Sequence, residues 1–147
     1  MSDGLATGHC LCGAIGFEVA GEPLDVGLCH CESCRRHSGG VCAPFATFPQ
    51  QAVRWRGAER QRFGSSPKVI RSFCGRCGSP LAYENEATGE EIDLYLGAFD
   101  RPDRFPVRQH THDAERVAWF DTIDRTPRFR GGARAGEPPL RTGPADG

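Results

Sequence analysis

The sequence lacks a strong net charge, a long apolar run and the apolar core of a signal peptide. Its 18 basic and 19 acidic side chains give a formal net charge of -1, so it presents no broad basic field for a nucleic-acid backbone. No uninterrupted apolar segment approaches the roughly 18 to 20 residues of a membrane span, and residues 1–12 contain no apolar run of the kind that directs secretion. We therefore expect a cytoplasmic protein without nucleic-acid or membrane partners.

Long helices are also disfavoured, because 19 glycines and 11 prolines are spread along the chain. Short apolar runs separated by turn residues are present instead, at the spacing of an all-β sandwich or barrel. In residues 14–19, for example, Ile15, Phe17 and Val19 alternate with smaller or polar residues, as in a half-buried strand. We expect strands at residues 14–19, 43–48, 52–56, 68–73, 80–84, 91–97 and 116–121. The only helical signal is about one turn at residues 32–37.

The length of 147 residues fits a single domain. We place this domain at residues 1–130. From residue 131 onward the chain is rich in glycine and proline and has almost nothing to bury, so we expect residues 131–147 to form a flexible tail. The sequence does not indicate an oligomeric state.

Eight cysteines stand against a single methionine and need a chemical explanation. They are Cys10, Cys12, Cys29, Cys31, Cys34, Cys42, Cys74 and Cys77. A disulfide framework is typical of short secreted chains, and nothing in this sequence indicates export. Metal sites built from thiolates are therefore the favoured interpretation.

The segment "FCGRCGSPL" at residues 73–81 has the spacing of a zinc knuckle. A tight turn with glycine at Gly75 and Gly78 would aim the sulfurs of Cys74 and Cys77 at one point. A knuckle provides half of a tetrahedral site. Cys10 and Cys12 can supply the other half, because alternate residues of a strand project to the same face. Together the four cysteines predict a closed structural zinc site, with no coordination position left for water or substrate.

The segment "CHCESCRRHSGG" at residues 29–40 packs three more cysteines into six positions. A strand end and the following turn can deliver Cys29, Cys31 and Cys34 to one ion. Three protein ligands with one exchangeable position are the arrangement of catalytic zinc. We therefore expect an open second metal site.

Several side chains could complete or line this second site. The fourth position is open to water, to a substrate, to His37 or to Cys42, although a small buried thiol is the ordinary interpretation of Cys42. His30 lies between two ligands and should point away from both. Arg35, Arg36 and His37 would suit an anionic substrate, because arginine pairs well with carboxylates, but they could also form a solvated turn. His110 and His112 have strand spacing and could face one site together, as substrate-pocket residues or as metal ligands, although two histidines beside an acidic residue also occur on ordinary surfaces.

Taken together, these residues resemble one known family, the glutathione-dependent formaldehyde-activating enzymes, which also include centromere protein V. The resemblance runs from about Gly8 to Phe129 and rests on the segments "GHCLCGAIGF", "CHCESCRRHSG" and "FCGRCGSPL", then "EIDLYLGAFDRPDRFPVRQH" and "AWFDTIDRTPRF". Seven cysteines in groups of two, three and two, each with a glycine nearby, make the pattern specific. Cys42 does not match the family's seven, whereas His30 and Gly39 match family positions.

This resemblance implies a mainly β protein with a zinc-stapled β-tent fold of short antiparallel sheets and little helix. It implies two zinc ions per chain. The structural ion would be held by Cys10, Cys12, Cys74 and Cys77, and the functional ion by Cys29, Cys31 and Cys34. The family's activity joins formaldehyde to glutathione, giving S-hydroxymethylglutathione, and is a carbon-sulfur lyase activity. We therefore expect a zinc-dependent lyase-type enzyme whose partners are a small thiol such as glutathione and an aldehyde.

Two other functions are compatible with the sequence, which does not identify the substrate. A non-enzymatic zinc module would bind a protein or a small thiol without turning it over. A redox or metal sensor would release zinc when Cys29, Cys31 and Cys34 are oxidised, because clustered thiolates are reactive.

Overall fold

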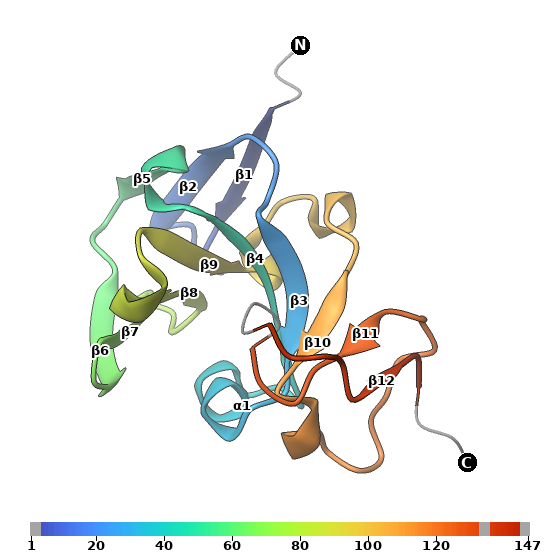
Figure 1. Ribbon diagram of the computed structural model, residues 1–147. Coiled ribbons are helices and arrows are strands. Elements are labelled where there is room, and N and C mark those ends of the chain that lie inside the picture. Colours follow the sequence, from blue (N-terminus) through green and yellow to red (C-terminus); the bar gives the residue numbers. More distant parts are fainter. Residues whose placement is uncertain (1–3, 133–135, 145–147) are drawn as a thin grey trace. The chain divides into compact units, whose positions relative to one another are not determined.

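The computed structural model describes residues 4–132 and 136–144. The described residues fall into two compact units. The first unit contains residues 4–25 and 46–105, and the second contains residues 26–45, 106–132 and 136–144. Figure 1 traces the helices and strands along the chain.

The first unit is built from antiparallel strands. One sheet has the order β1-β2-β5, with β1 at Leu5–His9, β2 at Ile15–Ala20 and β5 at Val53–Gly57. A meander follows in which consecutive strands pair, namely β6 (Gln61–Ser66), β7 (Val69–Phe73), β8 (Pro80–Asn85) and β9 (Glu91–Tyr95) (Figure 1). Short 3-10 turns connect the strands, at η1 (Gln50–Ala52), η2 (Glu86–Thr88), η3 (Leu96–Ala98) and η4 (Pro102–Arg104).

Aromatic side chains fill the core of the first unit. Phe17, in the middle of β2, is fully buried. Its ring centroid lies 5.5 Å from that of Trp55 and 5.1 Å from that of Phe99. Gly8 must be glycine, because a Cβ there would lie 2.3 Å from both the Ala98 carbonyl oxygen and the Phe17 ring. β1 therefore packs tightly against this core. The packing fixes the end of β1, after which the chain enters the turn that carries Cys10 and Cys12.

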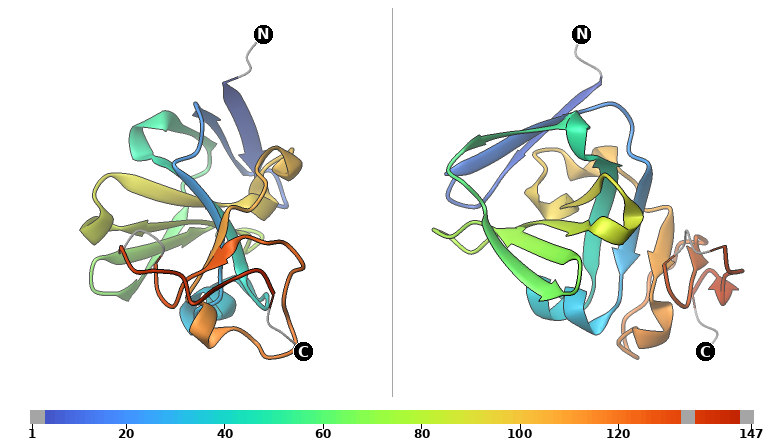
Figure 2. Two further views of the ribbon diagram at one scale, coloured as in Figure 1. Left: turned by 45° about the vertical axis from the view of Figure 1, so that its right-hand side comes forward. Right: turned by 60° about the vertical axis from the view of Figure 1, so that its left-hand side comes forward.

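The second unit is built around two short parallel strands, which lie side by side in Figure 2. β3 (Asp25–Cys29) pairs with β10 (Gln109–Thr111), with Cys29 opposite Thr111. β10 also pairs in parallel with β11 (Pro127–Arg128), and β11 pairs in antiparallel fashion with β12 (Arg141–Thr142). Gly27 lets β3 approach β10 closely, because a Cβ there would lie 2.9 Å from the Phe45 ring and 3.2 Å from the Gln109 carbonyl oxygen, and these neighbours would have to shift.

The helix α1 (Glu32–Ser38) begins almost directly after β3. Cys31 is its N-cap, and the Cys31 sulfur accepts a hydrogen bond from the backbone N–H of Cys34 at 3.3 Å. Gly39 ends the helix in the left-handed conformation, with φ 77°. Beyond it, β4 (Ala43–Pro49) begins in the second unit and continues into the first. A 3-10 turn, η5 (Asp113–Glu115), follows β10.

The structure confirms the expected mainly β fold of short strands with little helix, and the helical turn expected at residues 32–37 is α1. Most strand pairs are antiparallel, although β10 pairs in parallel with both of its neighbours. The prediction of a strand at residues 116–121 is wrong. The guanidinium group of Arg116 donates to the carbonyl oxygens of Val117, Ala118 and Phe120. The chain therefore curls around this side chain, and these carbonyl groups do not bond to a neighbouring strand.

We expected residues 131–147 to form a flexible tail. Of this segment, the structure describes residues 131–132 and 136–144. This part includes β12, and the Arg141 side chain forms ion pairs with Asp113 at 3.1 Å and Asp121 at 3.0 Å. The division of the chain at residue 130 stays a prediction. Across the described ranges, no helix has the length and apolar character needed to cross a membrane.

Candidate functional site

The first candidate site is a cluster of four cysteine sulfurs in the first unit. The sulfurs of Cys10, Cys12, Cys74 and Cys77 all lie within 4.8 Å of one another. The Cys10 and Cys12 sulfurs are 3.7 Å apart, and those of Cys12 and Cys74 are 3.9 Å apart. Cys10 and Cys74 are buried beside Ile15 and Leu81. Four thiolates so close together could hold one metal ion in a tetrahedral arrangement.

Two similar backbone turns bring these sulfurs together. In the second turn, Gly78 donates its N–H to the Cys74 carbonyl oxygen at 2.8 Å and has φ 81°. In the first turn, Gly13 donates to the Cys10 carbonyl oxygen at 3.0 Å and has φ 79°. The sequence predicted Cys10 and Cys12 on a strand, but β1 ends at His9 and both residues lie in the turn after it. Each half of the cluster is therefore a knuckle.

Hydrogen bonds to the sulfurs of this four-cysteine cluster stabilise negative charge on them. The backbone N–H of Ile15 donates to the Cys10 sulfur at 3.3 Å, and the N–H of Cys77 donates to the Cys74 sulfur at 3.5 Å. Bonds from the Ser79 hydroxyl and backbone are the main cause that lowers the pKa of Cys77 to about 5. Donors aimed at sulfur favour the thiolate, which is the form that binds metal.

The second candidate site is a cluster of three sulfurs in the second unit. Cys29 ends β3, Cys31 is the N-cap of α1, and Cys34 lies within the first turn of that helix. Their sulfurs lie within 4.8 Å of one another. Cys29 and Cys34 are buried, whereas Cys31 is partly exposed. Hydrogen bonds with Cys29 and then Cys34 lower the pKa of the Cys31 thiol well below its usual range, and the bond with Cys31 raises that of Cys29.

No fourth protein ligand completes this second cluster within residues 4–132 and 136–144. Cys42 is half-buried and lies outside both cysteine groups. His30 points away from the sulfurs, as expected, since its ring meets that of His110. His37 lies in the last turn of α1 and is outside the group as well. The cluster therefore offers a metal three protein ligands.

The arginines beside the second cluster already have partners on the chain. Nη1 of Arg35 donates to the carbonyl oxygens of His30 at 2.6 Å and Glu115 at 2.8 Å. Arg36 forms an exposed ion pair with Glu32 at 2.8 Å. The bond from Arg35 to Glu115 holds the η5 turn against α1. The role of Arg35, Arg36 and His37 in binding a substrate stays a prediction.

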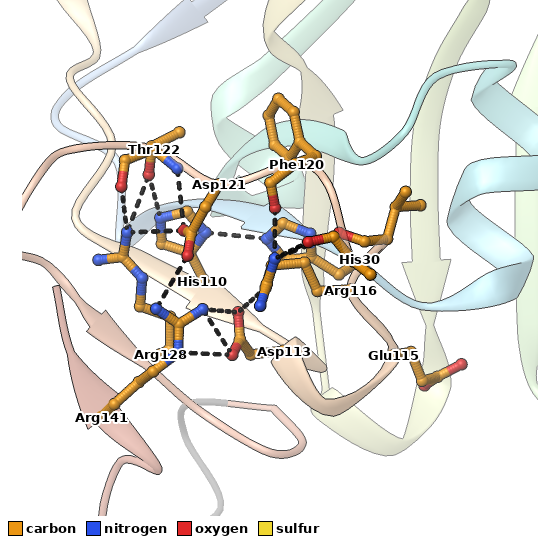
Figure 3. Close-up of polar contacts among 12 residues, drawn as sticks. His30, His110, Asp113, Glu115, Arg116, Phe120, Asp121, Thr122, Arg128 and Arg141 are labelled. Carbon is orange, nitrogen blue, oxygen red and sulfur yellow. Dashed lines mark hydrogen bonds and ion pairs between the residues drawn. The ribbon is translucent and has the colours of Figure 1, made fainter. Parts of the chain in front are cut away.

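A buried histidine pair lies in the second unit, where His30 directly follows β3 and His110 lies in β10. Nε2 of His30 is 2.8 Å from Nδ1 of His110, and both side chains are fully buried. The ring planes differ by 9° and the centroids are 5.1 Å apart. With the centroids so far apart and the nitrogens so close, the two nitrogens must lie between the ring centres. The pair is thus joined by a near-linear hydrogen bond, which Figure 3 shows.

Asp113 lies close enough to this histidine pair to complete a three-residue metal site. Its carboxylate, however, is 3.1 Å from Arg141 and 3.8 Å from Arg116. Two guanidinium groups therefore neutralise the carboxylate, and one nitrogen of each histidine already bonds to the other ring. We assign His30, His110 and Asp113 a structural role. His110 and His112 consequently do not face one pocket, because His110 is buried and the His112 side chain is 41% exposed.

Arg128 anchors the polar network around the histidine pair (Figure 3). Its guanidinium group is fully buried and contacts Asp121 at 3.2 Å and Asp124 at 3.0 Å. It also donates to the Thr122 carbonyl oxygen at 2.9 Å. Sequence reasoning gave no role to the residues of this network, namely Asp113, Glu115, Arg116, Asp121, Asp124, Arg128 and Arg141. Asp121, Asp124 and Arg128 lie in the segment "AWFDTIDRTPRF" that carries the family resemblance, but that resemblance assigned them no role.

Comparison with known proteins bears on both clusters. The chain matches the family model described as "Glutathione-dependent formaldehyde-activating enzyme" over residues 5–114, which include all seven clustered cysteines. An uncharacterised lyase of Schizosaccharomyces pombe is 32% identical over 91 residues, which cover 60% of this chain and 66% of that relative. The chain thus spans just under two thirds of the relative's length. The crystal structure of a Rhodobacter sphaeroides protein is similar, with a TM-score of 0.56 and 28% identity over 69% of this chain and 96% of that one.

Proposed function

This chain belongs to the glutathione-dependent formaldehyde-activating enzyme family, and we propose that it is a zinc-dependent carbon-sulfur lyase-type enzyme. Its substrates in this proposal are glutathione and formaldehyde, and its product is S-hydroxymethylglutathione. The single observation that carries the proposal is the cluster of Cys29, Cys31 and Cys34, whose three sulfurs leave a coordination position open to a substrate thiol. The cytoplasmic location and the absence of nucleic-acid and membrane partners stay predictions.

The two clusters differ in what they can do with a metal. Three or four thiolates are a donor set that suits zinc. In the proposal, Cys10, Cys12, Cys74 and Cys77 hold a structural zinc ion, since a closed site of four sulfurs has no position for a substrate. Cys29, Cys31 and Cys34 hold the functional one. The chain would therefore bind two zinc ions.

Zinc bound at the second cluster would supply a position where a thiol ionises and is held. The reaction itself joins the thiol sulfur to the carbonyl carbon while the carbon-oxygen π bond becomes an alkoxide. The proton lost by the thiol ends on that oxygen. Three cysteine thiolates would give a bound zinc site a net charge of -1, which would weaken its pull on a carbonyl group. The site would therefore act chiefly by holding and orienting the thiol beside the aldehyde.

The proposal is tested by zinc content and adduct formation in matched cysteine variants. Wild type should contain two zinc ions per chain and form S-hydroxymethylglutathione faster than buffer does. Cys31→Ser should contain one zinc and lose the acceleration, whereas Cys42→Ser should keep both. Full activity in a Cys31→Ser variant that has lost its second zinc would contradict the proposal. So would a wild type with two zinc ions and no acceleration.

A redox sensor is the second candidate function, favoured by the partly exposed Cys31 and its lowered pKa. In this case peroxide should release zinc from the second cluster well before it releases zinc from the first, which serves as an internal control. Release of one zinc ion at low peroxide, reversed by a thiol reductant, would support the sensor. Equal resistance of both zinc ions would exclude it.

A further inference from the structure

His30 connects the first two cysteines of the three-cysteine cluster and is held from three directions. Its backbone N–H donates to the Thr111 carbonyl oxygen at 3.0 Å. Its backbone carbonyl oxygen accepts a hydrogen bond from Nη1 of Arg35 at 2.6 Å. Its buried ring is joined to that of His110, with the two nitrogens 2.8 Å apart. These contacts fix the path of the chain from the first cysteine of the cluster to the second.

Arg35 joins this connecting residue to the third cysteine and to the η5 turn. Arg35 lies in α1 directly after Cys34, and its side chain reaches back to the His30 carbonyl oxygen, before the start of the helix. The same nitrogen, Nη1, donates to the Glu115 carbonyl oxygen at 2.8 Å. One guanidinium group therefore holds together the helix that carries the third cysteine, the residue between the first two, and η5.

Glu115 makes a second contact between η5 and α1. One oxygen of its carboxylate accepts a hydrogen bond from the backbone N–H of Glu32 at 3.1 Å. Glu32 is the first residue of α1 and directly follows the N-cap, Cys31. The Cys31 sulfur in turn accepts a hydrogen bond from the Cys34 N–H at 3.3 Å. The Glu115 side chain therefore holds the start of the helix turn that carries two of the three cysteines.

A site with three protein ligands depends strongly on contacts of this kind. Three thiolates held close together repel one another, so without outside contacts the segment would relax and the sulfurs would separate. A metal would then have to order the segment as it binds, at a cost in conformational entropy. The four-cysteine cluster depends on such contacts less, because it has a fourth ligand and each of its halves is a turn closed by its own backbone hydrogen bond.

We propose that Arg35 and Glu115 are positioning residues, which hold the three cysteine sulfurs together for zinc and so raise the affinity of the second site. Contacts behind metal ligands have this effect in other metal sites. The inference rests on the zinc-binding part of the proposed function, and it does not depend on the reaction or its substrate. It gives η5 a role at the metal site, although η5 contributes no ligand.

The test measures the affinity of the chain for each zinc ion by competition with a chromophoric chelator. In Arg35→Met the long apolar stem remains but both hydrogen bonds are lost, so the affinity for the second zinc ion should fall by about 10- to 100-fold. The affinity of the four-cysteine cluster should not change, which makes it an internal control. Arg35→Lys keeps the positive charge and a nitrogen that can donate, and it should recover much of the loss.

A pair of Glu115 variants separates the hydrogen bond of this side chain from its charge. Glu115→Ala removes the acceptor for the Glu32 N–H, and the affinity for the second zinc ion should fall. The loss should be smaller than in Arg35→Met, because this contact is exposed and water can replace it. Glu115→Gln keeps an acceptor oxygen and should bind zinc nearly as tightly as wild type.

Two further variants control for charge and for stability. Arg36→Met removes the same charge from the same helix, but Arg36 contacts only Glu32 among the printed ion pairs of α1 and is exposed, so zinc affinity should not change. Arg141→Met weakens the second unit without altering a contact of residues 29–35. It should lower the thermal midpoint and leave zinc affinity close to that of wild type.

The outcomes distinguish this inference from the proposed function. A wild type that binds a single zinc ion would overturn the second zinc site and this inference with it. If wild type binds two, equal affinity for the second ion in wild type and Arg35→Met would overturn the inference alone. So would an equal loss in Arg35→Met and Arg141→Met, which would show a general effect of stability. If Arg35→Met does not fold, the Glu115 pair decides, and equal affinities in its two variants would overturn the inference.

Discussion

Nε2 of His30 lies 2.8 Å from Nδ1 of His110, in a part of the second unit that is fully buried. Burial lowers the pKa of both histidines, that of His30 to about 4, so both rings are neutral near pH 7. Nε2 of His110 lies 3.1 Å from the Thr122 hydroxyl and 3.6 Å from the Asp124 carboxylate. The carboxylate favours a proton on that nitrogen. His110 therefore accepts from His30 through Nδ1 and donates through Nε2.

Replacing His110 should show how much this buried bond contributes. In His110→Phe, the N–H of His30 loses its acceptor inside the protein, so we expect the free energy of unfolding to fall by about 1–3 kcal/mol. In His110→Asn, the side-chain oxygen can take the place of Nδ1, and the loss should be smaller. Urea unfolding of both variants measures the difference. Equal losses in the two variants would mean that the hydrogen bond contributes nothing beyond packing.

The two turns of the first cluster predict that each cysteine in it is needed for the stability of the first unit. Cys74→Ser should lose about one zinc ion per chain, and its free energy of unfolding should fall by more than about 3 kcal/mol, because metal binding is coupled to folding. Cys42→Ser is the matched control, because Cys42 lies outside both clusters. Zinc analysis and thermal unfolding test the prediction, which would fail if Cys74→Ser were as stable as Cys42→Ser.

The acid stability of the second unit should depend on Asp124. Burial raises the pKa of this carboxyl, but hydrogen bonds from Thr122 and Thr126 and the charge of Arg128 outweigh that effect, and the pKa falls well below its usual range. A carboxyl whose pKa is lowered by folding stabilises the protein above its unfolded value of about 3.8. This stabilisation is lost as the pH falls through the folded value.

Asp124→Asn should therefore be less stable than wild type at pH 7, and the difference should shrink as the pH falls below about 4. Unfolding by urea at several pH values measures the difference between the two proteins. Any metal lost from the cysteines in acid affects both proteins and cancels in this difference. A difference that stays constant from pH 7 to pH 3 would contradict the assignment of Asp124 as a charged partner of Arg128.

Local sequence patterns predicted the parts of the fold that depend on nearby residues. The alternation of Ile15, Phe17 and Val19 gives β2, and the cysteines with their glycines indicate both groups of cysteines whose sulfurs could hold a metal. β6 has no apolar alternation that could have revealed it, since all of its residues are exposed. Sequence could not place Cys10 in a turn, because a spacing of two residues fits a strand and a knuckle equally well.

The polar network of the second unit could not be predicted for a different reason. Arg128 and Asp124 are four residues apart, but Asp113 and Arg141 are separated by 28 residues. Their pairing depends on β12 meeting β11, and both strands have only two residues. Such short strands have no periodicity to detect. The strand expected at residues 116–121 was wrong because nothing local shows that Arg116 will bind the carbonyl groups of its own loop.

Arg141 provides a direct test of the segment expected to be a tail. Its guanidinium group joins β12 to Asp113 and Asp121, and Asp113 is buried. Arg141→Met should leave Asp113 with Arg116 at 3.8 Å as its remaining ion-pair partner among the described residues. We expect the free energy of unfolding to fall by about 1–2 kcal/mol. A chain that ends at residue 132 should lose at least as much, because it also lacks β12. If instead both proteins unfold at the same urea concentration as wild type, the segment contributes nothing to the stability of the second unit and the flexible tail is the better description.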